Sequence, residues 1–283
     1  MPDEYMKKLF YLLVVLAACS LLGLTNGCAD KKKSVSAGDS IVVMSHEDSL
    51  EALISAMPMP KIADRLFTDF LYNYMSRRDF QYDRTIFPIK EYTGNMSKTI
   101  EKKDWKRERF FSNQYFYTLL FDSQQQRELL GDTAVSHAVV EKIYLEKGVV
   151  KQYVFERLQG AWMLTKIVNT PMESSPNYSF LNFYNGFVND SVFQSQSLSE
   201  NLMFSGPDPD DDLSTIEGVL LPEQFPSFAP PMPHGMMYNI MFGDGNKDSD
   251  TKIMLIEGIS NGSESELVFK RHRGKWLLCN LTM

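Results

Sequence analysis

The motif F-x-R-x-x-G-x-W-x-L occurs twice in this sequence, over residues 155–164 and over residues 269–278. The two occurrences lie 114 residues apart, and Ile167 and Leu281 extend the match at the same offset. A period of this length exceeds a single helix or hairpin, so it indicates two copies of one larger structural unit. A chain of 283 residues has room for both copies.

The glycine of each motif predicts a tight two-residue turn, because glycine tolerates the positive φ that such hairpins need. Arg157 then lies opposite Trp162, and Phe155 lies opposite Leu164, all on one face of the hairpin. The arginine can cover the tryptophan ring there. We interpret the motif as a packing motif, formed by Phe155, Arg157, Gly160 and Trp162 in the first copy and by Phe269, Arg271, Gly274 and Trp276 in the second.

Aromatic residues upstream of each motif repeat as well, at an offset of 113 residues. The matched pairs are Phe67 and Phe180, Phe70 and Phe183, Tyr74 and Phe187, Phe80 and Phe193, and Gln81 and Gln194. In the first copy, apolar residues recur at i, i+3 and i+4 over residues 62–75, which predicts an amphipathic helix. A further match aligns residues 116–121 with residues 237–242.

Each copy therefore predicts a long helix, a polar middle and several antiparallel strands that end in the motif hairpin, an α+β class. The last strands are expected at residues 135–145, 149–157 and 161–169, and at residues 252–259, 264–270 and 276–282. A linker rich in Pro and Ser occupies residues 170–176. We expect repeat 1 over residues 58–172 and repeat 2 over residues 173–283.

The N-terminus has the pattern of an export signal. Lys7 and Lys8 precede an apolar run over residues 9–24, which is typical of a secretion signal and short for a membrane span. An apolar run that ends in a small residue and then cysteine resembles the bacterial lipoprotein signal, in which that cysteine becomes the acylated first residue of the mature chain. Cys28 is the preferred attachment site, Cys19 is the alternative, and an uncleaved anchor helix is the third interpretation.

With the lipid on Cys28, residues 1–27 are the signal peptide and the polar residues 28–57 form a flexible tether. All three interpretations place the bulk of the chain outside the cytoplasm, held at a membrane of the cell envelope. Acidic residues after the cysteine resemble a surface-export signal in gut anaerobes, but Lys31, Lys32 and Lys33 stand near this position instead. This favours the periplasmic side of the outer membrane.

The composition excludes several function classes. The net charge of −7 argues against a nucleic-acid partner, which usually meets a clustered basic face. Three cysteines are too few for a disulfide scaffold. The four histidines are far apart and lack zinc-ligand spacing, and the glycine-rich nucleotide motifs and the G-x-S-x-G motif do not occur. We therefore expect no cofactor.

The repeated pattern of a helix and curved antiparallel strands resembles the cone fold of the nuclear transport factor 2 (NTF2)-like proteins. Two such units behind a lipoprotein signal resemble the bacterial family of domain of unknown function 4348. The resemblance covers residues 58–283 and depends on the paired F-x-R-x-x-G-x-W-x-L motif. The resemblance implies tandem cone domains but no activity, so no functional residue is carried over from the family.

Enzymes that resemble this cone use an Asp base with Tyr or His partners inside the cavity. The residues that could play these parts are Tyr115, Tyr117, Asp122, His137 and Tyr144 in the first copy, and His234, Tyr238 and Asp244 in the second. None of them belongs to a recognisable catalytic motif. Tyrosines in strand-like segments are also common for packing alone, so we assign no catalytic residue.

Two acidic segments could each be a calcium-binding loop or a solvent-exposed loop. Asp244, Asn246 and Asp248 carry oxygen atoms at alternate positions, as at the start of a calcium loop. Ser249 stands where that loop needs glycine, and Leu255 stands where it needs a bidentate glutamate. We therefore expect a solvated hairpin loop here rather than a metal site, and a disordered acidic loop at residues 208–212.

Residues 221–233 hold five prolines alternating with Phe and Met. We expect this segment to cover the core of the second copy, although its apolar side chains could also meet a partner. The function most consistent with these patterns is a membrane-tethered module that binds a small molecule or an envelope protein. The alternatives are an isomerase- or hydratase-like enzyme that uses a cone cavity, and a structural subunit of an envelope complex.

Overall fold

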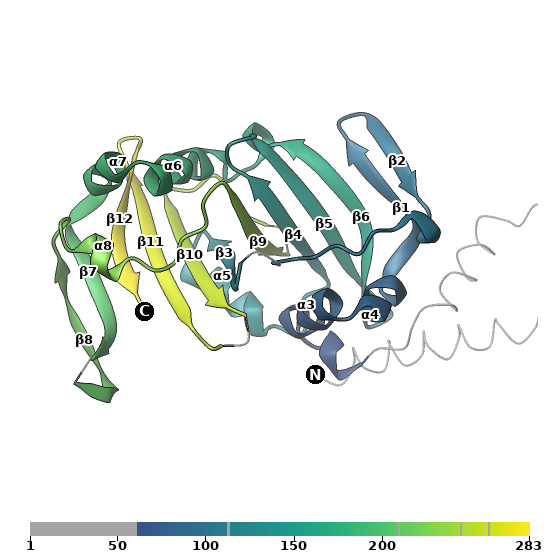
Figure 1. The fold of residues 1–283 in the computed structure, drawn as a ribbon, viewed down its shortest axis with the longest axis horizontal. Helices are drawn as coiled ribbons and strands as arrows, with labels where there is room; N and C mark the ends of the chain where they lie inside the picture. Colours follow the sequence, from purple (N-terminus) through teal and green to yellow (C-terminus); the bar gives the residue numbers. More distant parts are fainter. Residues whose placement is uncertain (1–60, 112–113, 209, 244, 260) are drawn as a thin grey trace, which may run out of the picture. The chain divides into compact units, whose positions relative to one another are not determined.

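The computed structural model describes residues 61–283, apart from residues 112, 113, 209, 244 and 260. The signal, the tether, Cys19 and Cys28 lie outside these residues. The described strands form a single sheet in the order β2-β1-β6-β5-β4-β9-β3-β10-β11-β12-β7-β8 (Figure 1). The strands are β1 (Thr85–Thr93), β2 (Met96–Ile100), β3 (Phe116–Phe121), β4 (His137–Tyr144), β5 (Val149–Leu158), β6 (Ala161–Pro171), β7 (Leu198–Asp208), β8 (Asp211–Leu220), β9 (Met236–Phe242), β10 (Thr251–Gly258), β11 (Glu264–His272) and β12 (Lys275–Thr282).

Short helices accompany the sheet, and the α+β class predicted from the repeat is confirmed. The α-helices are α3 (Phe67–Ser76), α4 (Arg78–Asp83), α5 (Gln124–Arg127), α6 (Tyr178–Asn189), α7 (Ser191–Gln196) and α8 (Phe225–Phe228). The 3-10 helices are η1 (Ile62–Asp64), η2 (Lys102–Asp104), η3 (Glu128–Gly131) and η4 (Met172–Ser174). Within the described part of the chain, no helix has the length and apolar character needed to cross a bilayer.

The helix expected over residues 62–75 is interrupted. Leu66 is extended, with φ −114° and ψ 141°, so α3 begins only at Phe67. The carboxylate of Asp64 explains the break, because it accepts hydrogen bonds from the backbone N of Lys61 at 2.6 Å and of Trp162 at 3.1 Å. The segment before α3 is thus held by the motif hairpin instead of continuing the helix.

The central strands are exchanged between the two halves of the chain. β9, from the second half, pairs antiparallel with β4 of the first, and β3, from the first half, pairs antiparallel with β10 of the second. β3 and β9 meet in parallel at a single pair, Thr118 and Asn239. The Asn239 side chain strengthens this junction, since its Oδ1 accepts from Leu120 N at 2.9 Å and its Nδ2 donates to Glu141 at 2.9 Å.

The exchange also gives two hydrophobic cores that lie on opposite faces of the central strands. Along β10, Ile253 and Leu255 belong to the core that contains α3, whereas Met254 and Ile256 belong to the core that contains α6. Successive side chains of a strand point to opposite faces, so each core takes one face. Each half of the chain therefore completes the core of the other.

The aromatic framework of each core repeats closely. Phe67 lies 4.9 Å from Trp162 and 5.4 Å from Phe155, measured between ring centroids. The corresponding Phe180 lies 5.5 Å from Trp276 and 5.2 Å from Phe269. Beyond these rings, Gln81 Nε2 donates to Tyr74 O at 3.2 Å and Gln194 Nε2 donates to Phe187 O at 3.0 Å.

The motif hairpins have the predicted register. Arg157 pairs with Trp162 and Phe155 with Leu164, and the second copy pairs Arg271 with Trp276. The turn residues have positive φ in both hairpins, 82° at Gly160 and 79° at Gly274. The arginines differ, however: Arg271 lies over the Trp276 ring at 5.2 Å, whereas Arg157 donates to the backbone oxygens of Thr133 and Gly160.

The sequence match between residues 116–121 and residues 237–242 was one residue out of register. Leu120 of β3 pairs with Met254, and Ile240 of β9 pairs with Val140, the counterpart of Met254. The equivalent strands are therefore related by an offset of 120 residues and not 121. A shift of one residue moves every side chain of a strand to the other face. At the corrected offset, Leu120 lies in the core that contains α6, whereas its counterpart Ile240 lies in the core that contains α3.

Two expectations about loops were wrong. Residue 209 lies outside the described residues, but strands β7 and β8 occupy most of the rest of residues 208–212 in place of the expected loop. Asp208 pairs with Asp211 and accepts from Ser214 Oγ at 3.2 Å. The segment between β9 and β10 is not a hairpin loop, because β3 lies between these two strands. In that segment Asn246 is buried and donates to Leu120 O at 2.7 Å.

Residues 221–233 cover the second core, as expected. Phe225 of α8 is buried against Phe187 at 6.1 Å, and Phe228 packs on Phe204 at 5.0 Å. Tyr184 on α6 donates to Pro233 O at 3.2 Å. The segment, with α8 inside it, thus covers α6, and Phe225 and Phe228 are used for packing.

Candidate functional site

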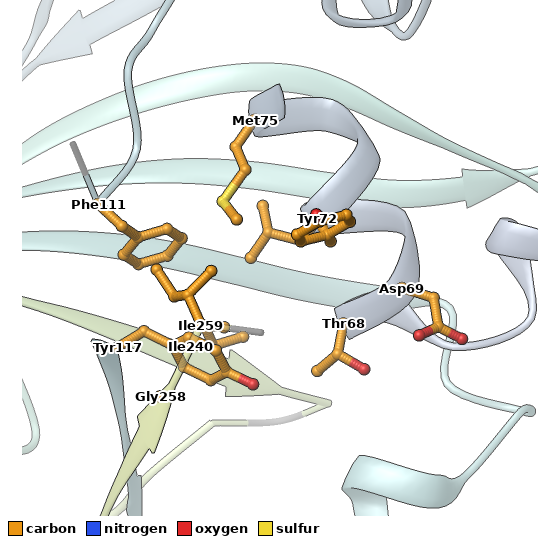
Figure 2. A pocket seen from close by; sticks show the side chains of 10 residues that line it. Thr68, Asp69, Tyr72, Met75, Phe111, Tyr117, Ile240, Gly258 and Ile259 are labelled. Carbon is orange, nitrogen blue, oxygen red and sulfur yellow. The ribbon is translucent and has the colours of Figure 1, made fainter. Parts of the chain in front are cut away.

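A pocket of about 280 Å³ opens between α3 and the ends of the exchanged strands (Figure 2). α3 forms one wall, and the other wall combines β3 from the first half with β9 and β10 from the second. This α3 pocket therefore exists only because the central strands are exchanged. Its volume is close to the lower limit of ordinary small-molecule sites.

The lining of the α3 pocket combines apolar and polar groups, with Thr68 and Asp69 at one end. Figure 2 shows Met75 and Phe111 toward one end and Thr68 and Asp69 toward the other. The apolar lining residues are Leu71, Met75, Phe111, Ile240 and Ile259. Such a surface favours an apolar ligand and orients it through a few polar contacts.

A tyrosine and a carboxyl group form the main polar contact beside the pocket. Tyr117 lines the pocket, and its hydroxyl donates to Glu257 at the end of β10. Burial raises the pKa of Glu257, and the neighbouring Glu264 raises it further. Burial also raises the pKa of Tyr117, with additional contributions from Glu257, Glu264 and Asp69. The carboxyl groups of Asp69 and Glu257 near Tyr117 favour a ligand group that is cationic or donates hydrogen bonds.

The corresponding space in the second half is filled. At an offset of 113 residues the counterpart of Leu71 is Tyr184, a larger side chain that is fully buried. Residues 221–233 close over it, with Phe225 and Pro233 buried. Among the described residues this place is thus open beside α3 and filled beside α6, although both halves share the same aromatic framework.

A separate polar cluster surrounds Glu108 and includes Tyr238 of β9 from the second half. The Tyr153 hydroxyl donates to Glu108 at 2.5 Å, and Lys142 Nζ lies 3.5 Å from the same carboxylate. Burial and Glu108 together raise the pKa of Tyr153. Burial alone would lower the pKa of Lys142, but Tyr238 and Glu108 raise it overall. These groups satisfy one another, so we interpret the cluster as a structural network.

The structure scatters most of the catalytic candidates drawn from the sequence. Tyr115 is 89% exposed and His234 is also exposed. His137 pairs with Glu156 at 2.8 Å, and Asp122 pairs with Lys252.

Three of the four candidate tyrosines reach one of the two polar groups. Tyr117 lines the α3 pocket, whereas Tyr238 and Tyr144 lie near Lys142 in the network around Glu108. Asp244 lies outside the described residues. The sequence reasoning missed Glu257 and Glu108, because neither belongs to a motif and only the fold brings them to a tyrosine.

The suggested calcium ligands do not converge in the described residues. Asn246 uses its amide to bind a backbone oxygen, and Asp248 pairs with Arg271 at 3.0 Å. Asp122 holds this loop instead, accepting from Lys247 N at 2.6 Å and from Ser249 Oγ at 3.0 Å. Across the described part of the chain, no three His, Cys, Asp or Glu residues are grouped as metal ligands would be.

Comparisons with known proteins agree with this architecture. The family model described as "Domain of unknown function (DUF4348)" matches residues 46–283. Among solved structures, an NTF2-like protein from Bacteroides fragilis is 39% identical to this chain, with a TM-score of 0.74. That match covers 80% of this chain and 98% of the other. No curated protein matches the chain.

Proposed function

The chain belongs to the family of domain of unknown function 4348 and has an NTF2-like fold, and from this premise we propose that it is a lipid-anchored envelope protein that binds a small molecule in the α3 pocket. The observation that carries the proposal is the open pocket in a framework whose second copy is filled at the same place. A cavity kept beside a well-packed core costs van der Waals contacts. A ligand bound in the pocket would restore the lost van der Waals contacts.

The lining supports a small ligand that has an apolar part and one cationic or hydrogen-bond-donating group. The apolar part would lie against Leu71, Ile240 and Ile259. The polar group would face the carboxyl group of Asp69 and the pair of Tyr117 and Glu257. A purely anionic ligand would meet repulsion at this end.

The binding proposal is tested by calorimetric titration of the full chain with tryptamine and octylamine as probes. Met75→Trp places a large ring at the pocket wall and should weaken binding of both probes by about tenfold or more. Met203→Trp is the matched control, because Met203 is 45% exposed on β7 and does not line the pocket. Equal binding by both variants, or no binding of either probe to the unmodified chain, would contradict the proposal.

The tether is the second part of the proposal, supported by the signal-like N-terminus and the cysteine that follows it. We place the lipid on Cys28 and the protein on the periplasmic side of the outer membrane. Labelling of bacterial cells with an alkyne analogue of palmitate should mark the chain, and Cys28→Ala should abolish the label. Loss of the label in Cys19→Ala alone would move the site to Cys19, and an unlabelled wild-type chain would refute the anchor.

One observation favours an enzyme as the second candidate. Glu257 has a raised pKa and faces a tyrosine at the pocket, an arrangement that can exchange a proton with a bound ligand. Deuterium exchange at the carbon next to the carbonyl of cyclohexenone, followed by NMR, tests this activity. Catalysed exchange that disappears in Glu257→Gln would support the enzyme, and exchange at the uncatalysed rate would exclude this chemistry.

A further inference from the structure

A second pocket lies in the second half, where α6, α7 and the hairpin between β11 and β12 meet. Its volume is about 630 Å³, well within the usual range of ligand sites. This α6 pocket shares no lining residue with the α3 pocket. A function assigned to it is therefore independent of the function proposed above.

The α6 pocket is built on an aromatic ring that both copies contain. Phe193 lies 5.8 Å from Phe183 with an interplanar angle of 55°. In the first half, Phe80 lies 5.8 Å from Phe70 with an interplanar angle of 51°. The two frameworks therefore position this ring in the same way, and the surroundings of the ring can be compared directly.

Cations cover the ring in the first half and leave it open in the second. Phe80 is only 4% exposed, with the Arg84 guanidinium 5.1 Å and the Lys61 ammonium 5.3 Å from its centre. The positions that correspond to these two cations both hold serine, and Ser197 replaces the arginine. As a result Phe193 is 38% exposed and lines the α6 pocket.

Aromatic rings and uncharged polar side chains make up most of the lining. Tyr178 and Phe193 present rings that are 37% and 38% exposed. Amide and hydroxyl side chains surround them, from Ser179, Asn182, Gln196 and Ser197. Lys275 is the one formally charged residue among those that line the pocket in the described chain.

The Ser179 hydroxyl is oriented by its neighbours. Trp276 Nε1 and Arg271 Nη1 donate to its oxygen at 3.2 and 3.0 Å. A hydroxyl has two acceptor positions and one proton, so these two bonds occupy its acceptor positions and its proton is left to donate. In the first half Leu66 occupies this position, and within the described chain the Trp162 indole N–H has no acceptor.

We propose that the α6 pocket binds a neutral saccharide. A sugar ring has an apolar C–H face that can lie against Phe193 or Tyr178 and hydroxyl groups that can bond with amide and hydroxyl side chains. A purely apolar ligand would leave those polar groups without partners, which is costly. A ligand with several negative charges would find only one positive charge to compensate them, that of Lys275.

The test is a glycan array that contains neutral, acidic and amino-sugar oligosaccharides, probed with the full chain in mild detergent. The best-bound glycan is then titrated by calorimetry against the variants. Phe193→Ala should weaken binding by about tenfold or more. A double variant, Asn177→Asp with Ser197→Arg, copies the Asp64 and Arg84 pair of the first half, and the arginine should cover the ring and block binding.

Val192→Ala is the matched control, since Val192 is 63% exposed next to Phe193 but does not line the pocket. Far-UV circular dichroism verifies that each variant is folded. The proposal is overturned if no neutral glycan on the array binds, or if a bound glycan has the same affinity for Phe193→Ala and the double variant as for the control. Undiminished binding to Met75→Trp separates this site from the α3 pocket.

Discussion

Neither half of this chain should fold on its own, because the exchanged strands complete the core of the opposite half. The core around α3 contains five buried side chains supplied by the second half, namely Tyr238, Ile240, Phe242, Ile253 and Leu255. Burial of each contributes about 1.5–3 kcal/mol, so a fragment of residues 58–172 loses about 8–15 kcal/mol. A whole domain is usually stable by only about 5–15 kcal/mol.

The assay is expression of residues 58–172 and residues 173–283, separately and together. Each fragment alone should lack cooperative thermal unfolding and the dispersed NMR spectrum of a folded protein. Co-expressed fragments should assemble into one complex, because β3 and β9 can pair with the opposite fragment. A separate fragment that unfolds cooperatively would refute the reasoning and would support two independent domains divided at residues 172 and 173, a boundary that stays a prediction.

Three further substitutions test the energetics. Asp122→Asn should destabilise the fold by about 3–5 kcal/mol in chemical denaturation, because it removes the carboxylate beside the buried Lys252 ammonium. Burial raises the pKa of Glu141, so the folded state holds its proton more tightly than the unfolded state. The contribution of Glu141 to the free energy of unfolding is therefore full below the normal glutamate pKa and is lost as pH rises through the pKa of the folded state. Glu141→Gln should remove this dependence of stability on pH, measured by chemical denaturation at several pH values. Gly274→Ala should lower the free energy of unfolding by about 1 kcal/mol, because Gly274 has a φ of +79° although the space around it is open. Gly131→Ala is the control: the space there is also open and φ is not positive, so the loss of stability should be smaller in the same assay.

The local parts of the fold were predictable from the sequence because their determinants are close in the chain. The register of each motif hairpin depends on one turn, so Gly160 and Gly274 were enough to place Arg157 and Arg271 opposite the tryptophans. The same reasoning located β4, β5 and β6 within a few residues. Strands β7 and β8 escaped notice because polar residues interrupt their apolar pattern.

The strand exchange could not be predicted, because β3 and its counterpart β9 have nearly the same apolar pattern and could each pair within their own half. Which partner a strand takes depends on long-range contacts such as Asn239 with Leu120 and Glu141. Both the α3 pocket and the contact of Tyr117 with Glu257 follow from that choice. The candidate site was therefore beyond the reach of sequence patterns even though Tyr117 was among the residues considered.

The two copies provide an internal comparison that separates packing from function. Residues shared by both copies, such as Phe155 and Phe269, make the same ring contacts and explain stability. Two of the differences fall at the two pockets. Leu71 against Tyr184 decides whether the space beside the first helix of each copy is open, and Arg84 against Ser197 decides whether an aromatic ring is covered. If these differences only reflected tolerance to change, filling either pocket should raise stability without affecting any ligand. If the pockets are binding sites, filling them should remove binding while the shared framework stays intact.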